Sequence, residues 1–319
     1  MTEISRVMLG LLALLIVGSP AAQTTYPSKP IRLMVASSTG TATDTVARMI
    51  GQKMSESWGQ AVVVDNRPGA GGALAASTVA KAAPDGHTLL LSNGFAITAA
   101  LQPNLPYDPL KDFARVTQIG YGTAILVVAP ALGVKSVKDL IALAKARPGK
   151  IIFGSTAAGS GSHLTGARFI RAAGIKVIIV AFKGGPEATI EVLAGRTHYS
   201  IVPLAVALPF IKDGRLLALA SSRHLPVLPD VPALAETLPE FKRSENSFGL
   251  LAPAGTPRPI LHQISKEVAR ILDLPDIKER LQPTGFIPAP TTPEEYDKIL
   301  REQIETLSKV ARDAGLKAN

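Results

Sequence analysis

Two segments of the chain combine glycine with a dense run of hydroxyl side chains. They are Ala-Ser-Ser-Thr-Gly-Thr-Ala-Thr-Asp at 36–44 and Gly-Ser-Thr-Ala-Ala-Gly-Ser-Gly-Ser-His at 154–163. Each follows a short apolar run and leads into a segment with helical periodicity. Free N–H groups at a helix start carry about half a positive charge and suit a carboxylate or a phosphate. The two segments therefore favour a site for one small anion, although ordinary helix capping uses the same residue types.

Motifs of the common enzyme classes do not occur in the sequence. It has no Gly-x-Ser-x-Gly, no Ser-x-x-Lys and no Walker lysine pattern. A third glycine-rich stretch, 67–73, departs from the dinucleotide fingerprint because Pro68 interrupts the turn and Leu74 replaces the third glycine. The 5 histidines lie too far apart for a local pair of metal ligands, and there is no cysteine. We expect no catalysis, no cofactor and no metal.

The composition describes an ordered and basic protein. The 319 residues include 34 Lys and Arg against 25 Asp and Glu, a net charge of +9. The basic residues are scattered and are not interleaved with aromatic residues, which argues against nucleic-acid binding. The excess charge favours acidic small molecules as partners.

The first 22 residues read as a signal peptide. The apolar run Val7–Val17 is too short to span a bilayer, which needs about 20 residues, and the small residues Gly18–Ala22 offer a cleavage site. A membrane anchor is the alternative. We expect the mature protein to be exported to the periplasm.

The remainder of the chain alternates between strand and helix patterns, which predicts an α/β fold with mostly parallel sheet. The runs predicted as strands are 31–35, 62–64, 88–91, 125–129, 150–153, 176–180, 216–220 and 248–251. Helices are predicted over 136–147, from 257 onwards, and after a capping box at 292–295. Gln118–Thr123 and Lys242–Ser247 look like two crossovers. They predict one lobe from 23–120 with 246–319, and a second from 121–245.

Longer strings of the sequence resemble the Bug family, the extracytoplasmic solute receptors of tripartite tricarboxylate transport systems. The strings are 26–32, 65–72, 81–90, 105–113, 228–232 and 248–257. They span essentially the whole mature chain. The resemblance implies a two-lobed periplasmic binding protein of type II that closes on its ligand like a Venus flytrap. It also implies a small organic acid as ligand, held partly through water, and a membrane permease as partner; we expect a monomer.

The resemblance implies that the ligand carboxylate is bound by the loop after the first strand and by the matching loop of the second lobe, which in this sequence are the two hydroxyl-rich segments. We therefore expect it between Ser38–Thr43 and Thr156–Ser160, with Asn93 and Phe95 beside it. The full set of expected ligand-binding residues is Ser37, Ser38, Thr39, Gly40, Thr41, Thr43, Asn93, Phe95, Thr156, Ala158, Gly159, Ser160, Lys183 and Val202.

Several of these positions depart from the family's usual residues. The first loop keeps only Gly40 and Asp44 of a common Pro-Phe-Ala-Pro-Gly-Gly-x-x-Asp pattern. Phe182 replaces the tyrosine before Lys183, and Val202-Pro203 stands where Asp-Asn is common, so a ligand amine loses a partner. For Asp44 itself we favour capping of the helix and pairing with Arg48 over ligand contact, because a carboxylate repels an acid.

Two other functions stay open on sequence grounds. A receptor of this kind can present its closed form to a signalling partner in place of a permease. An exported α/β enzyme is the other alternative, which would need a nucleophile and base brought together by the fold.

Overall fold

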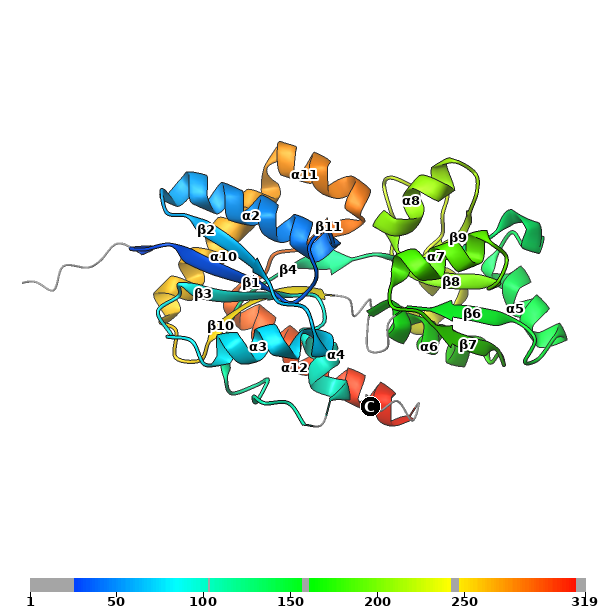
Figure 1. Cartoon of the computed structure of the whole chain (residues 1–319), viewed down its shortest axis with the longest axis horizontal. Coiled ribbons are helices and arrows are strands. Elements are labelled where there is room, and N and C mark those ends of the chain that lie inside the picture. Colours follow the sequence, from blue (N-terminus) through cyan, green and yellow to red (C-terminus); the bar gives the residue numbers. More distant parts are fainter. Residues whose placement is uncertain (1–25, 103, 157–160, 242–246, 314–319) are drawn as a thin grey trace, which may run out of the picture.

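The computed structural model describes residues 26–102, 104–156, 161–241 and 247–313 of the chain. They form two separate β-sheets, each covered by helices, lying side by side along the long axis of the molecule (Figure 1). The first sheet has the order β11-β4-β10-β3-β1-β2 and the second has the order β7-β6-β8-β5-β9.

The strands of the first sheet come from both ends of the described chain. They are β1 (Ile31–Val35), β2 (Val62–Asn66), β3 (Thr88–Ser92), β4 (Phe113–Gly122), β10 (Ser247–Pro253) and β11 (Phe286–Pro288). The second sheet is built from β5 (Ala124–Val128), β6 (Ile152–Ser155), β7 (Ile178–Ala181), β8 (Tyr199–Pro203) and β9 (Leu217–Ser221). The chain thus passes from one sheet to the other at Thr123 and returns between β9 and β10.

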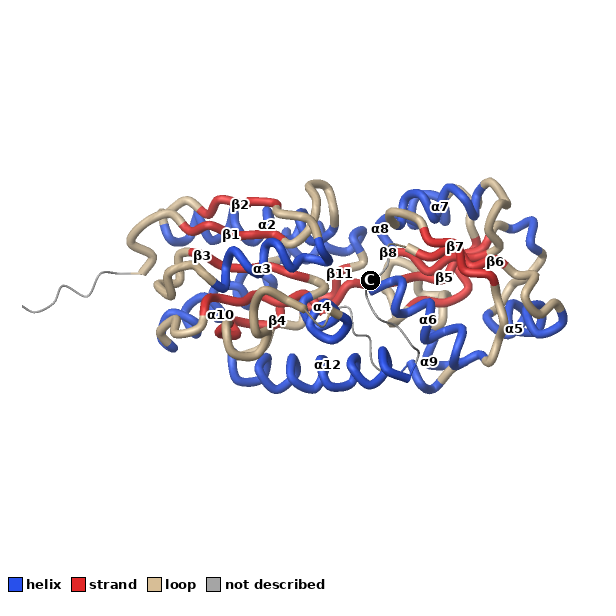
Figure 2. Tube along the Cα trace, turned by 60° about the horizontal axis from the view of Figure 1, so that its bottom comes forward, coloured by secondary structure: helices blue, strands red, loops and turns tan. Residues whose placement is uncertain are grey.

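The helices lie on both faces of each sheet, as Figure 2 shows. Those of the first lobe are α2 (Ala42–Trp58), α3 (Ala73–Ala80), α4 (Phe95–Leu101), α10 (Arg258–Asp273), α11 (Pro275–Leu281) and α12 (Pro293–Asp313). Those of the second lobe are α5 (Val137–Ala146), α6 (Gly161–Ala173), α7 (Gly185–Leu193), α8 (Leu204–Lys212) and α9 (Leu234–Thr237). No helix among these described residues is long and apolar enough to cross a membrane.

The capping box expected before the last helix is confirmed. Glu295 N–H donates to Thr292 Oγ1 at 3.2 Å, and Thr292 N–H donates to Glu295 Oε2 at 2.8 Å. These two reciprocal bonds satisfy free donors at the start of α12.

The prediction of mostly parallel sheet is wrong in part. Pairings of β1 with β2 and β3, and of β6 with β7 and β8, are parallel, but β10 is antiparallel to β3 and β4. The pairings of β11 with β4, and of β5 with β8 and β9, are also antiparallel. The antiparallel pairings thus involve the strands on either side of the two crossings, β4 and β5 at the first and β9 and β10 at the second.

Strands β4, β8 and β11 were not predicted, and 118–122 was taken as part of a joint. Gly120 is one of the two glycines in that predicted joint, yet it lies inside β4. A Cβ there would approach Ile287 O to 2.3 Å, so the glycine permits the close passage of β11. The predicted joint Lys242–Ser247 lies almost entirely outside the described residues, as does the expected signal peptide. The lobe boundaries stay predictions.

Each sheet is buried on both faces, which explains the nearly continuous apolar runs. In β1, Leu33 and Val35 face one cluster of the first lobe and Met34 faces the other. In β5, Leu126 and Val127 likewise face opposite clusters of the second lobe. The edge strands differ: Val63 of β2 and Ile179 of β7 are exposed.

Two of the strings that resemble the family contact each other at the start of the first sheet. Tyr26 Oη donates to Gly86 O at 2.7 Å, and its ring meets Trp58 and His87 edge-on. His87 Nε2 in turn accepts from Ser28 N–H at 3.3 Å. These strings therefore stabilise the fold at the end of the sheet opposite the crossing at Thr123.

Replacement of Tyr26 by phenylalanine tests this contact. We expect Tyr26→Phe to lower the free energy of unfolding by about 1 kcal/mol, because Gly86 O loses its donor while the ring packing stays. Urea unfolding followed by circular dichroism measures the change. Tyr107→Phe is the matched control, since no hydrogen bond of that hydroxyl is found in the described part of the chain. An equal loss in both variants would contradict the role of the Tyr26 hydroxyl.

Candidate functional site

The pairing of the strands brings the candidate loops to one place. Within the first sheet, the C-terminal ends of β1, β2, β3 and β4 share one edge, because β10 reverses direction between β3 and β4. Within the second sheet, the C-terminal ends of β6, β7, β8 and β9 share the edge at which β5 begins. Both edges meet at Thr123, so the C-terminal ends of these strands point toward the crossing between the two sheets (Figure 1).

Some hydroxyl groups of the first hydroxyl-rich loop form hydrogen bonds within the loop itself. Ser37 Oγ lies 2.9 Å from Thr41 Oγ1, which donates to Ser38 O at 2.9 Å. Thr41 also caps the 17-residue helix α2, accepting from Asp44 N–H at 3.4 Å. The residues at the tip of the loop, 38–40, are exposed.

Asp44 closes this loop onto the helix. It is 3% exposed, accepts from Gly40 N–H at 2.9 Å, and lies 3.0 Å from Arg48 Nε. Burial alone would raise the pKa of Asp44, but bonds from Gly40, Arg48 and Asn66, with the Arg48 charge, hold it below its usual value. The expected capping and pairing role is therefore observed.

The third glycine-rich stretch supports the first loop. Gly72 has a φ of +95°, and a Cβ there would approach Ala36 Cβ to 3.0 Å. Just before it, Asn66 Nδ2 donates to Ser37 O at 3.0 Å, and Asn66 Oδ1 accepts from Arg48 Nη2 at 3.1 Å. This stretch packs against the loop with its backbone, which requires glycine.

The second loop begins with a serine–histidine pair that was not predicted. Ser155 Oγ lies 2.9 Å from His163 Nδ1, in the first turn of α6. Burial lowers the pKa of His163, and its bond with the Thr156 backbone opposes this only in part, so the ring is neutral near pH 7. Because Ser155 is fully buried, it cannot reach a substrate. The pair instead fixes the start of the loop to α6.

The structure separates the remaining expected residues into two groups. Asn93 is half-buried at the end of β3, and Lys183 is exposed after β7, its N–H donating to Glu187 Oε2 at 3.0 Å. The other group is enclosed. Thr43, Phe95, Thr156 and Val202 are 2%, 5%, 3% and 0% exposed.

The aromatic ring of Phe95 packs against Tyr107 and Phe113 in the first lobe and does not line the space between the sheets. Val202 lies within β8, where it pairs with Ile125. Because Thr43, Phe95 and Val202 are buried among protein atoms, the site proposed below omits them; their contact with a ligand stays a prediction. Ala158, Gly159 and Ser160 lie outside the described residues.

One residue at this edge was missed by the sequence analysis. Arg223 lies two residues after β9, and its Cζ is 3.9 Å from the centroid of the Tyr121 ring at the end of β4. The signal was present in Ser-Ser-Arg-His at 221–224, where hydroxyls and a cation follow a predicted strand.

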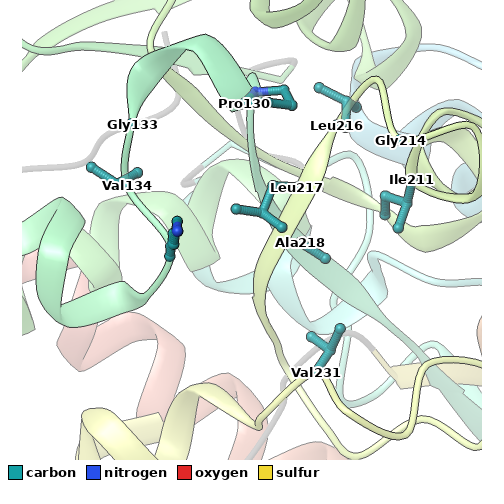
Figure 3. A pocket seen from close by; sticks show the side chains of 10 residues that line it. Pro130, Gly133, Val134, Ile211, Gly214, Leu216, Leu217, Ala218 and Val231 are labelled. Atoms are coloured by element: carbon teal, nitrogen blue, oxygen red, sulfur yellow. The ribbon is translucent and has the colours of Figure 1, made fainter.

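A cavity of about 340 Å³ lies elsewhere on the second lobe (Figure 3). It is lined by apolar side chains such as Val134, Ile211 and Leu217, with Lys135 at its margin. Leu217 begins β9, so this cavity is at the opposite end of the sheet from the candidate loops. Within the described ranges, no group of 3 or more His, Asp or Glu residues is placed to hold a metal.

Acidification tests the role of Asp44. A carboxylate with a depressed folded-state pKa stabilises the fold fully above its unfolded pKa of about 3.9, and this is lost as the pH falls through the lower folded value. We expect Asp44→Asn to unfold at a lower temperature than wild type at pH 7, with the gap closing below about pH 4. Thermal unfolding between pH 7 and about pH 2.5 measures this difference in unfolding temperature. Asp213→Asn, an exposed carboxylate with no ion pair in the described chain, is the control; a pH-independent gap for Asp44→Asn would refute this role.

Comparison with known proteins identifies relatives along nearly the full length of the chain. Protein BugT of Bordetella pertussis is 34% identical over 307 residues, covering 94% of each protein. A solved structure described as a periplasmic transporter is 33% identical, with a TM-score of 0.80, covering 92% of this chain and 99% of that one.

Two further solved structures contain bound acids. Rpa4515 of R. palustris with adipate is 32% identical with a TM-score of 0.81, covering 92% of this chain and 99% of that one. MatC of Rhodopseudomonas palustris with bound malate is 30% identical with a TM-score of 0.74, covering 89% and 99%. These similarities confirm the two-lobed periplasmic binding protein fold.

The model of the tripartite tricarboxylate transporter family receptor matches residues 46–316. Its members are binding proteins of transport systems, not enzymes. With the two-sheet fold and the facing loops, this match shows that the chain is a periplasmic solute-binding protein belonging to the TctC, or Bug, family of tripartite tricarboxylate transporter receptors.

Proposed function

We propose that this protein captures a small organic carboxylate between its two lobes and delivers it to the membrane permease of a tripartite tricarboxylate transport system. The observation that carries the proposal is the convergence of two hydroxyl-rich helix starts, those of α2 and α6, on the space between the sheets.

The chemistry of these helix starts suits a carboxylate. The first N–H groups of a helix have no intrahelical acceptor, and the helix dipole makes this end positive. In loop 38–40 the side chains that stay exposed are hydroxyls, while the nearest carboxylate, Asp44, is already paired with Arg48. An anion entering here meets donors without meeting an unpaired negative charge. The proposed contacts are Ser38, Thr39 and Gly40 of the first loop, the loop after Thr156, Asn93 and Lys183.

The bound acids in related structures support the same class of ligand. Adipate and malate are both dicarboxylates of four to six carbons. The proteins that bind these acids are 32% and 30% identical to this chain, so adipate and malate are suitable probe ligands for it. The first loop departs from the family's usual residues, which predicts that the acid preferred by this protein differs in detail from adipate and malate.

Delivery and location complete the proposal. Residues 1–22 direct export to the periplasm, and the lobes 23–120 with 246–319, and 121–245, close on the ligand about the crossings. The protein acts as a monomer, and the closed form is the one the permease recognises.

A bulky substitution at the tip of the first loop tests ligand capture. We expect Thr39→Trp to abolish the heat of adipate and malate binding in isothermal titration calorimetry, because an indole fills the space between the loops. The unfolding temperature of the empty protein should not move, since Thr39 is exposed.

The matched control is Thr78→Trp, which changes an exposed threonine in the C-terminal half of α3, away from the loops. It should bind both acids as wild type does. Retained affinity in Thr39→Trp would remove the first loop from the site, and a wild type that binds no acid of a broad carboxylate panel would refute the proposed ligand class.

A further inference from the structure

The backbone of Arg223 is held firmly at the crossing between the lobes. Ser222 N–H donates to Ala124 O at 2.8 Å, and Ser222 Oγ accepts from Ala124 N–H at 3.2 Å. Ser221 Oγ also donates to Arg223 O. These bonds continue the pairing of β9 with β5 up to Ser222. The side chain of Arg223 therefore extends from a backbone whose position is fixed by hydrogen bonds.

The side chain of Arg223 is stacked but not paired. Its guanidinium lies 3.9 Å from the centroid of the Tyr121 ring, while Nε is buried and has no hydrogen-bond partner in the described chain. Stacking occupies the face of a guanidinium and leaves the N–H groups at its edge unused. Because Nε is buried, the terminal Nη groups are the donors that we assign to a carboxylate. No acidic side chain among the described residues neutralises this charge.

Other arginines of the protein are used differently. Many are paired with a carboxylate within 3.1 Å: Arg32, Arg48, Arg67, Arg115, Arg196, Arg270 and Arg301. Arg223 is half-buried and has no carboxylate partner among the described residues. Its charge is therefore one that the fold itself does not use.

The sheet order relates Arg223 to the two helix starts. In the first sheet β4, which carries Tyr121, is three positions from β1, and in the second sheet β9 is three positions from β6. At roughly 4.8 Å per strand, the Arg223–Tyr121 pair is about 14 Å along the strand ends from either loop. A short diacid, with a hydrogen bond at each of its two carboxylates, has a length of that order.

We propose that Arg223 binds the second carboxylate of a dicarboxylate whose first carboxylate lies at the starts of α2 and α6. It is the residue that makes the receptor prefer diacids to monoacids. This assignment rests on the proposed function. It adds a specificity-determining residue at the crossing, outside the two loops.

Paired ligands that differ in one carboxylate test the assignment. Wild type, Arg223→Met and Arg223→Lys are titrated with adipate and hexanoate, and with succinate and butyrate. We expect wild type to bind the better diacid about 10- to 100-fold more tightly than its monoacid, the ratio that a charged hydrogen-bonded pair supports. Arg223→Met should bind both acids of a pair with nearly equal, weak affinity. Arg223→Lys, which keeps the positive charge but lacks the planar set of guanidinium N–H donors, should retain part of the preference for diacids.

Arg215→Met is the matched control. Arg215 precedes the same strand, and its Cζ lies 5.2 Å from the centroid of the Phe210 ring, at the end of β9 away from the loops. It should keep the wild-type preference. A preference unchanged in Arg223→Met, or affinity lost equally for diacids and monoacids, would overturn the assignment while leaving the proposed function in place. A wild type that binds none of the acids would overturn both.

Discussion

The passage of the chain from β4 to β5 through the single residue Thr123 is the constraint on which the rest of the structure depends. It forces β4 to end where β5 begins. Because β10 runs against both β4 and β3, the ends of β1, β2 and β3 come to that same edge. The second sheet repeats this through β5, which runs against β8 and β9. One connection thereby places the C-terminal ends of the strands that precede the candidate loops at the two edges that meet at Thr123.

Some polar groups at this edge are used by the fold itself, and the others are those that we assign to the proposed ligand. Ser37, Thr41 and Asp44 shape the first loop, and Ser155 with His163 shapes the second. Carboxylates near the loop are already paired, as Asp44 is with Arg48. The donors that remain are helix N–H groups, exposed hydroxyls and cations on the edge strands of the second sheet. A site of this kind binds anions through geometry more than through net charge.

The strings that resemble the family are largely structural. Tyr26 contacts Gly86 and His87, and Ala254 N–H donates to Asp112 O at 3.0 Å, which joins two further strings. Another, at 228–232, ends beside β9, where Ser221 N–H donates to Pro232 O at 2.9 Å. These contacts explain why the family is recognisable while its usual first-loop residues are replaced. Packing restricts the residues of the strings, whereas the exposed tip of the first loop, residues 38–40, has few packing neighbours.

The sequence by itself determined the α/β class, the family, and the two hydroxyl-rich segments. These depend on local patterns: buried strands read as apolar runs, helix starts carry capping residues, and the strings are long. It did not reveal β4, because Gly120 resembles a turn until β11 is placed against it. Nor did it reveal that Phe95 and Val202 are enclosed, since burial depends on which neighbours the fold supplies.

Tertiary structure alone decided the placement of Ser155 beside His163 and of Arg223 on Tyr121. Tyr121 lies in β4 of the first sheet and Arg223 follows β9 of the second, about a hundred residues along the chain, so no periodicity connects them. Their contact follows from strand order, which is set by long-range pairing. Local sequence patterns report the environment of one residue, and a binding site is defined by residues that only the completed fold brings together.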